Sequence, residues 1–359
     1  MQPRNGRLAV AEPKNGQPES DRIEGALHPR ETPEVFGHLN AIAAFAAARR
    51  SARLAHGFIL DGPRGVGKAT LAYSFARQLL RNGKEDGAAD RLITEGSHPD
   101  LLALKRPYDH KTKRLKTVLT VDEVRRIIPF FGATAALGGY RVVIVDAADD
   151  MNAGAANALL KSLEEPPSRA VLFLIAHNSG RLLPTLHSRC VSLTLDPLSD
   201  DDVHKALAAQ PSLQSADVAV KAFALRHAAG SAGRAMAMLN GPAAALIDLE
   251  KLLDRLPDID FGKLQALAAR LGGGRVLADF QMGADLIETW IEKRLRAEAS
   301  TAPAASGALA RLAEVWENTR ARNSATESLN LDREQALFAT VVELADALSS
   351  PRRPLVSTR

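Results

Sequence analysis

The residues best suited to chemistry form a glycine-rich segment, Gly62 to Ala69, which reads GPRGVGKA. It follows an apolar run at 57–61 that predicts a buried strand, and it precedes a helical stretch over about 68–80. Strand, glycine loop and helix in this order are the context of a phosphate-binding loop, where backbone N–H groups and a helix N-terminus surround phosphate oxygens. The spacing therefore favours a nucleotide phosphate site over a βα turn that binds nothing.

The loop lacks one part of a complete ATP site. Lys68 can reach the β- and γ-phosphates, but the next residue should be Ser or Thr, whose hydroxyl holds magnesium. Here it is Ala69, and Thr70 comes one residue late, about 100° further round the helix, so it should point away from the metal. The loop residues expected to line a nucleotide are Gly62, Gly65, Val66, Gly67, Lys68, Ala69 and Thr70.

A second part of the site is also incomplete. The apolar run at 141–146 ends in Asp146, whose carboxylate could hold nucleotide-bound magnesium. In ATPases of this kind a glutamate follows and orients the attacking water, but here the next residue is Ala147. Asp149 is a poor substitute because a base must lie within hydrogen-bond reach of the water. Together with Ala69, this predicts slow hydrolysis or none.

A third candidate is Arg189 in the tetrapeptide HSRC, which precedes an apolar run at 191–195. An arginine supplied by one subunit to its neighbour can stabilise charge on a transferring phosphoryl group. On spacing alone, a capping or surface arginine is the favoured interpretation.

Composition limits the classes of protein that fit. A chain of 359 residues with 46% apolar and 25% charged residues predicts two or three globular domains. The single cysteine, Cys190, excludes a disulfide framework and a cysteine-based zinc site. We see no secretory signal and no run near the ~20 apolar residues that span a bilayer, so we expect a cytoplasmic protein without membrane contact. The net charge of +4 is compatible with nucleic acid nearby, whereas 4% aromatic residues argue against a base-stacking surface.

The pattern along the chain predicts five regions. Residues 1–30 are polar and rich in Pro and Gly, which predicts a disordered tail. Over 31–197, apolar runs at 57–61, 101–104, 118–121, 141–146, 171–175 and 191–195 alternate with helical stretches, as in a parallel sheet with flanking helices. Short helices are expected over 198–242, longer ones over 243–350, and a loose tail over 351–359. The apolar stripe of Ile287, Ile291 and Leu295 fits a helical core or a subunit-packing surface.

Several segments together resemble the AAA+ clamp-loader ATPases of bacterial DNA polymerase III. They are GSHPDLL (96–102), TVDEVRRIIPFF (120–131), YRVVIVDAADDMNAGAANALLKSLEEPP (140–167), the strand VLFLIAHN and LLPTLHSRC. The resemblance covers about 33–240 well and the later helices more weakly. It implies an α/β P-loop AAA+ domain over 31–197, a small helical lid over 198–242 and an all-α collar over 243–350 that builds a ring of five subunits.

The residues that are missing from the ATP site indicate which branch of the family this chain resembles. Its motor subunits, gamma and tau, keep the Ser or Thr after the lysine and an acidic residue after the aspartate. This chain keeps Arg189 and lacks both, which resembles the branch that donates an arginine finger in trans without hydrolysing ATP. Asn178 lies where the family has its first sensor residue, and Arg234 lies one position later than its sensor arginine.

The resemblance also implies partners and cofactors. It implies a component of the DNA polymerase III holoenzyme that contacts gamma/tau and delta and, through the complex, the sliding clamp and primed DNA. Binding of ATP or ADP is compatible with the surviving loop, and hydrolysis is not expected. The region 80–97 has no cysteine, so we expect a short loop there instead of the family's zinc module, and no metal. Two alternatives stay open: an active ATPase of the gamma/tau type, in which Thr70 or water replaces the missing hydroxyl, and a scaffold that binds no nucleotide.

Overall fold

The computed structural model describes residues 19–51, 54–81, 83, 87–111, 114–274, 277–301, 307–329 and 331–349. The chain divides into two compact units. The first comprises Met1–Ala216 with Ala228–Ala237, and the second comprises Asp217–His227 with Met238–Arg359. The predicted lid, 198–242, is shared between these units, and its boundaries remain a prediction.

The first unit is built on a five-stranded parallel sheet with the order β2–β5–β6–β1–β7. Its middle strand, β6, is buried along its whole length, as its continuous apolar run predicts. A short antiparallel hairpin lies outside this sheet. The sheet strands are β1 (Gly57–Asp61), β2 (Leu101–Lys105), β5 (Arg141–Asp146), β6 (Ala170–Ala176) and β7 (Val191–Thr194), and the hairpin strands are β3 (Tyr108–Asp109) and β4 (Arg114–Leu115).

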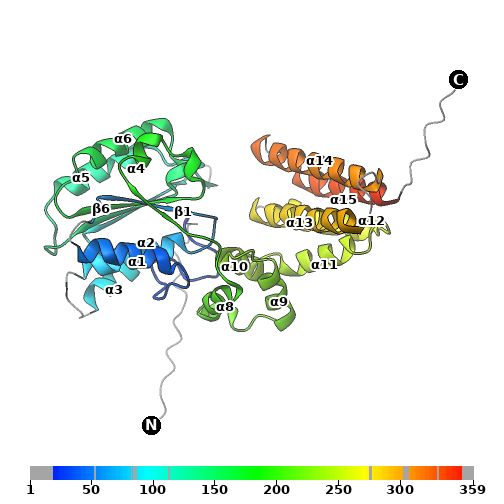
Figure 1. The fold of residues 1–359 in the computed structure, drawn as a ribbon, viewed down its shortest axis with the longest axis horizontal. Coiled ribbons are helices and arrows are strands. Elements are labelled where there is room, and N and C mark those ends of the chain that lie inside the picture. The colour runs from blue at the N-terminus through cyan, green and yellow to red at the C-terminus, as the bar shows by residue number, and fades with distance from the viewer. Residues whose placement is uncertain are drawn as a thin grey trace, which may run out of the picture. The chain divides into compact units, whose positions relative to one another are not determined.

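Helices cover both faces of the sheet (Figure 1). Successive side chains of a strand point to opposite faces, and both faces here are apolar, so both must be covered. In β1, Phe58 and Leu60 belong to one apolar cluster and Ile59 to the other. One face is covered by α1 (Leu39–Arg50), α2 (Lys68–Leu80) and α3 (Ala88–Thr94). The other is covered by α4 (Val121–Arg125), α5 (Ile127–Gly132), α6 (Ala153–Glu164) and the single turn α7 (Pro184–His187).

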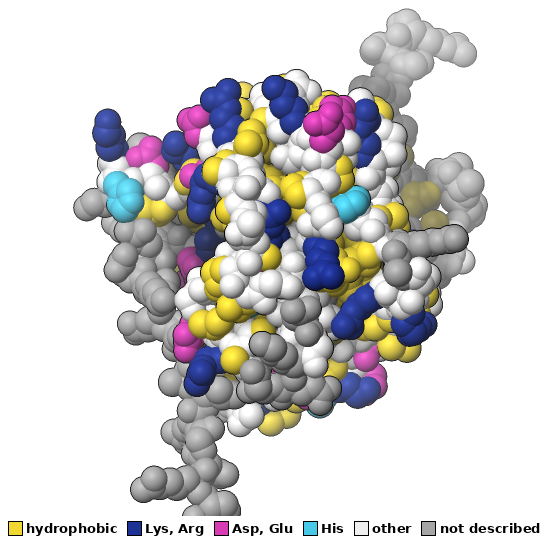
Figure 2. Space-filling view, turned by 90° about the vertical axis from the view of Figure 1, so that its left-hand side faces the viewer, with side chains coloured by type: hydrophobic (Ala, Val, Ile, Leu, Met, Phe, Trp, Pro, Cys, Tyr) yellow, Lys and Arg dark blue, Asp and Glu magenta, His cyan; other side chains and the backbone are white. Residues whose placement is uncertain are grey.

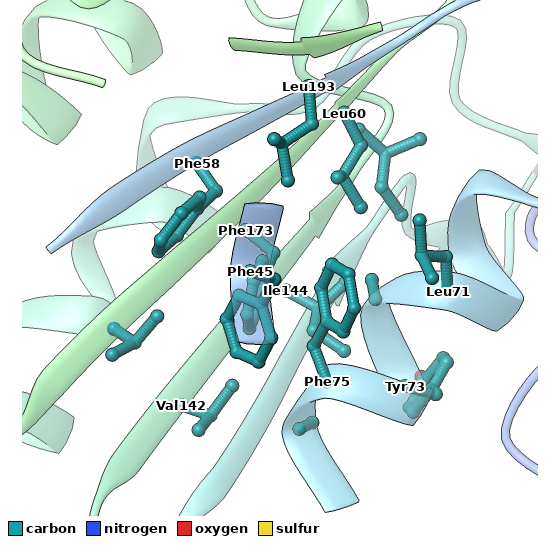
Figure 3. Packing of buried hydrophobic residues seen from close by; sticks show 14 of the residues in the cluster. Phe45, Phe58, Leu60, Leu71, Tyr73, Phe75, Val142, Ile144, Phe173 and Leu193 are labelled. Atoms are coloured by element: carbon teal, nitrogen blue, oxygen red, sulfur yellow. The ribbon is translucent and has the colours of Figure 1, made fainter. Parts of the chain in front are cut away.

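Four phenylalanines join α1 and α2 to the sheet (Figure 3). Phe45 of α1 stacks on Phe75 of α2, with ring centroids 3.9 Å apart, and it also meets Phe58 and Phe173 at 5.5 and 5.9 Å. All four rings are at most 1% exposed. This cluster fixes α2, and with it the loop that precedes α2, on the sheet.

The helices that follow the sheet are divided between the two units. In the first unit are α8 (Asp200–Ala208), the 3-10 turn η3 (Pro211–Leu213) and the start of α10 (Ala232–Asn240). The second unit is helical in its described residues, and Ile287 and Ile291 are buried within it, which favours the core interpretation of their stripe. Its helices are α9 (Val218–Arg226), α11 (Ala243–Leu253), α12 (Phe261–Gly272), α13 (Leu277–Thr301), α14 (Gly307–Leu329) and α15 (Arg333–Ser349).

Three sequence-based expectations need correction. Residues 19–30, which we assigned to a disordered tail, pack on the first unit, and His28 and Ala26 are buried; the rest of that predicted tail, and the tail at 351–359, lie outside the described residues. The run at 118–121 is not a strand, since Leu119 makes only an isolated bridge to Met151 and α4 begins at Val121. The expected loop over 80–97 contains α3. In the described part of the chain, no helix is long and apolar enough to cross a membrane.

Candidate functional site: a phosphate loop and a surface arginine

The loop between β1 and α2 has the backbone that a phosphate-binding loop requires. Gly65 and Gly67 have φ values of +76° and +104°, in the region that favours glycine. A Cβ on Gly65 would lie 2.3 Å from Ser231 Oγ, so a larger residue is also excluded by contact. His38 donates from Nε2 to Val66 O at 2.7 Å and fixes the end of the loop at the start of α2. The residues predicted to line a nucleotide, 62–70, form this loop and the first turn of α2, and their role in binding remains a prediction.

Lys68 is directed onto its own loop. Its side chain is buried, and Nζ donates to the carbonyl oxygens of Gly62 at 2.5 Å and Pro63 at 2.6 Å. A phosphate entering the loop would therefore compete with these carbonyls for the ammonium group. Ala69 packs against the apolar cluster that contains Phe45 and offers no oxygen for a metal.

Three carboxylates at or just beyond the carboxyl ends of β1 and β5 act on the charge of Lys68. Burial lowers the pKa of Lys68 to about 8, although Asp146, Asp149 and Asp61 oppose this shift. Burial also raises the pKa of Asp146 to about 7, helped by the negative charge of Asp21 and opposed by Lys68. A proton on Asp146 therefore competes near neutral pH with any magnesium ion that would bind its carboxylate.

Asp149 and Asp61 have structural roles that the sequence did not indicate. Asp149 Oδ2 accepts from the backbone N–H groups of His177 at 3.1 Å and Asn178 at 3.0 Å, so it joins the ends of β5 and β6. Asp61 accepts from Ser179 N at 3.2 Å and Ser179 Oγ at 2.6 Å. The sequence offers one signal for these roles: Asp61 ends the apolar run of β1, and Asp149 follows that of β5 by three residues. Asn178 is exposed at this edge, and its backbone is held by Asp149.

The start of α10 packs directly on the loop. Gly233 N donates to Gly65 O at 2.8 Å, and Ser231 Oγ donates to Arg64 O at 2.9 Å. Arg234 N donates to Ser231 Oγ at 3.0 Å, which places Arg234 beside the loop despite its shifted position in the sequence. Ser231 was not among the residues predicted from the sequence.

Arg189 lies apart from this loop, near the amino ends of the sheet strands. It follows the one-turn helix α7. The neighbouring Cys190 packs against the start of β1, since a Cβ added to Gly57 would lie 2.5 Å from Cys190 Sγ. Because β7 pairs with β1 from Phe58 onward, Arg189 lies near the amino ends of these parallel strands, whereas the phosphate loop follows their carboxyl ends. From Gly57 to Asp61 alone the strand rises about 13 Å.

The guanidinium of Arg189 is available at the surface. Its side chain is 36% exposed and contacts Glu164 Oε1 through Nη2 at 3.1 Å, while Nη1 donates to Thr185 O and Ser188 Oγ, both at 3.2 Å. An ion pair this exposed contributes at most about 1 kcal/mol, so a stronger anion could displace Glu164.

Burial raises the pKa of Cys190 to about 11, so its thiol stays protonated and serves packing. On the face shown in Figure 2, Lys and Arg side chains are interspersed with apolar and acidic ones.

The fold and the loop define the class of protein. A parallel sheet in this strand order, a glycine loop after β1 and a helix packed on that loop make the first unit a P-loop α/β domain of the AAA+ type. The predicted fold class is confirmed by this arrangement and by the helical region that follows it.

Comparison with known proteins narrows the class. Residues 37–199 match the family described as "DNA polymerase III, delta subunit". The chain is 46% identical to DNA polymerase III subunit delta' of Pseudomonas aeruginosa over 146 residues, which are 39% of this chain and 43% of that one. It is 34% identical to the Escherichia coli subunit delta' over 201 residues, or 54% of this chain and 58% of that one. The matches thus span about half the length of these relatives.

A solved structure of a DNA polymerase III gamma subunit-related protein from Thermotoga maritima aligns with a TM-score of 0.42 and 17% identity, over 84% of this chain and 99% of that one. The sequence matches make the chain a homologue of DNA polymerase III subunit delta' over the aligned residues, which confirms the resemblance seen in the sequence.

Proposed function

We propose that this protein is a delta'-type subunit of a bacterial DNA polymerase III clamp loader, and that it supplies Arg189 to a neighbour's ATP site without hydrolysing ATP itself. The observation that carries the proposal is the position of Arg189. It is exposed at the sheet edge opposite its own phosphate loop, so its guanidinium can meet a nucleotide phosphate only in another subunit.

The state of the chain's own loop supports the second half of the proposal. The residue after Lys68 is alanine, Asp146 is followed by alanine, and Oδ2 of Asp149 accepts from two backbone N–H groups. A water or magnesium ion near Lys68 would therefore lack both the hydroxyl and the base that hydrolysis needs. The surviving glycines and Lys68 still suit ATP or ADP as a bound ligand.

The same proposal places the chain among partners. Gamma/tau and delta would be its neighbours in the ring, the second unit would serve as the collar, and the sliding clamp and primed DNA would be reached through the complex in the cytoplasm. Exposed apolar side chains in the second unit, Phe261, Leu329 and Leu331, fit a surface covered by other subunits. We expect no zinc site in the chain.

The test begins with the purified chain alone. We expect no magnesium-dependent ATP hydrolysis above that of the Lys68→Ala variant, and we expect the chain to co-purify with the other clamp-loader subunits when their masses are determined. Clear hydrolysis that Lys68→Ala abolishes would instead establish an active ATPase of the gamma/tau type. Failure to bind nucleotide, with assembly intact, would leave a pure scaffold.

ADP binding should depend on the charge of Lys68. Since the pKa of Lys68 is lowered to about 8, its cation is present at pH 7 and is lost as the pH rises through 8. We expect ADP affinity to fall above pH 8 by up to about tenfold per pH unit, because bound phosphate favours the protonated amine. Equilibrium titrations at pH 7, 8 and 9.5 measure this. The Lys68→Arg variant, whose guanidinium does not titrate here, should show a flat profile; a flat wild-type profile would disprove the role of Lys68.

A further inference from the structure

Residues 19–31, here called the strap, precede α1 and lie against two different parts of the first unit. His28 is fully buried, Ala26 is 1% exposed, and the other strap residues except Glu24 are at least partly buried. A polar segment with few apolar side chains gains little from burial alone. Specific polar contacts must therefore hold the strap in place.

One end of the strap is held at the sheet by an ion-pair cluster. Lys105, the last residue of β2, donates from Nζ to Glu19 Oε1 at 2.6 Å and to Asp21 Oδ1 at 2.8 Å. The other oxygen of Asp21 lies 3.0 Å from His28 Nε2. Burial alone would raise the pKa of Asp21, but His28 and Lys105 lower it well below its usual range, so Asp21 is ionised at neutral pH.

Glu19, Asp21 and His28 also have the residue types of a metal site, and their ligand atoms lie within 4.8 Å of one another. The ammonium group of Lys105 already contacts both carboxylates. The cluster is therefore better described as an ionic anchor. Further along the strap, Arg77 of α2 donates from Nη2 to Arg30 O, which fixes the strap to the helix that follows the phosphate loop.

The middle of the strap contacts the helical part of the same unit. Leu27 N donates to Oε1 of the buried Gln210 at 2.9 Å, and Ser212 Oγ donates to Gly25 O. Ile23 Cδ1 lies 3.1 Å from the position of a Cβ on Gly233. The strap thus touches η3 and the start of α10, the same α10 residues that bond to the phosphate loop.

We propose that the strap fastens η3 and the start of α10 to the sheet, and so holds α10 against the phosphate loop in one arrangement. The Gly233–Gly65 and Ser231–Arg64 hydrogen bonds are few for a helix that must stay fixed on a loop. The strap adds a second set of contacts, which connects the start of α10 to Lys105 at the end of β2. This inference does not depend on the proposed role in a clamp loader.

Hydrogen exchange of the full chain tests the strap. The double variant Glu19→Gln/Asp21→Asn removes the ionic anchor at the sheet. We expect amides of residues 230–235 to exchange at least about tenfold faster than in the wild type, since they open locally once the anchor is lost. Amides of 243–349, in the other unit, should keep their wild-type rates.

A matched control removes two charges that take no part in the anchor, one within the strap at Glu24 and one just after it at Glu34. Glu24 and Glu34 are exposed, and neither has an ion pair among those found in the described residues. The Glu24→Gln/Glu34→Gln variant should leave exchange at 230–235 unchanged. If it accelerates exchange as much as the anchor variant, charge alone is responsible and the strap has no fastening role.

A second variant protects the test against loss of folding. Ile23→Ala/Ser212→Ala removes only contacts between the strap and the helical part and keeps the ionic anchor. We expect exchange at 230–235 to rise by about threefold or more. The proposal is overturned if residues 230–235 exchange at wild-type rates in both variants. If the anchor variant does not fold, wild-type rates in Ile23→Ala/Ser212→Ala alone overturn it.

Discussion

Replacing Arg189 by alanine should lower ATP turnover of the assembled clamp-loader complex by ~10³–10⁵, the range found when an arginine finger is removed from phosphoryl-transfer sites. In the proposed role, the guanidinium supplies positive charge where the transferring phosphoryl group of the neighbour's ATP develops negative charge. Because the side chain is 36% exposed and its ion pair with Glu164 lies at the surface, the variant should fold and assemble normally. Steady-state ATPase of the reconstituted complex measures the effect.

Lys161→Ala is the matched control. Lys161 is an exposed cation on α6, the helix that also carries Glu164, and its removal changes the net charge by the same amount. Turnover within about twofold of the wild type is expected. Arg189→Lys should recover little, since an ammonium cannot make the bidentate contact of a guanidinium. Turnover of Arg189→Ala close to that of the wild type would rule out the finger.

Phe45→Ala should destabilise the first unit by about 3–5 kcal/mol. The ring is fully buried between α2 and the sheet, where it stacks on Phe75 and touches Phe58 and Phe173, and these rigid neighbours cannot collapse into the space it leaves (Figure 3). Urea unfolding followed by tyrosine emission reports this unit, because Tyr73, Tyr108 and Tyr140 all lie in it and both tryptophans lie in the other.

Leu39→Ala on the same helix is the control. Leu39 is 76% exposed, so its truncation should change stability by no more than about 0.5 kcal/mol. If Phe45→Ala lowers the free energy of unfolding by less than about 1 kcal/mol, the packing of α1 on this face of the sheet contributes little to stability.

The sheet could be predicted from the sequence because its strands are buried on both faces. The runs at 57–61 and 141–146 match β1 and β5 residue for residue, and the helix after the glycine loop begins at Lys68 as expected. The run at 118–121 failed because a short apolar stretch has no periodicity that separates strand from helix start. Only tertiary context decides that Leu119 bridges to Met151 and that α4 begins at Val121.

The glycine loop between β1 and α2 could also be predicted, since its glycines and lysine lie close together in the sequence. Contacts between distant segments could not. Nothing in the local pattern indicates that Ser231 reaches Arg64, or that Asp149 holds the backbone of Asn178. Most of the strap falls in the stretch 1–30, whose polar composition with several glycines and prolines predicts disorder. Its contacts with Lys105, more than 70 residues further along the chain, have no signal in that local composition.

The most direct test of the central claim is a structure of the assembled complex with a non-hydrolysable ATP analogue. It would show whether the arginine of this chain reaches a phosphate in the adjacent subunit. We predict that the Arg189 guanidinium leaves Glu164 and lies about 2.7–2.9 Å from an oxygen of the neighbour's γ-phosphate. A structure in which Arg189 keeps its pairing with Glu164, with no nucleotide in reach, would contradict the account.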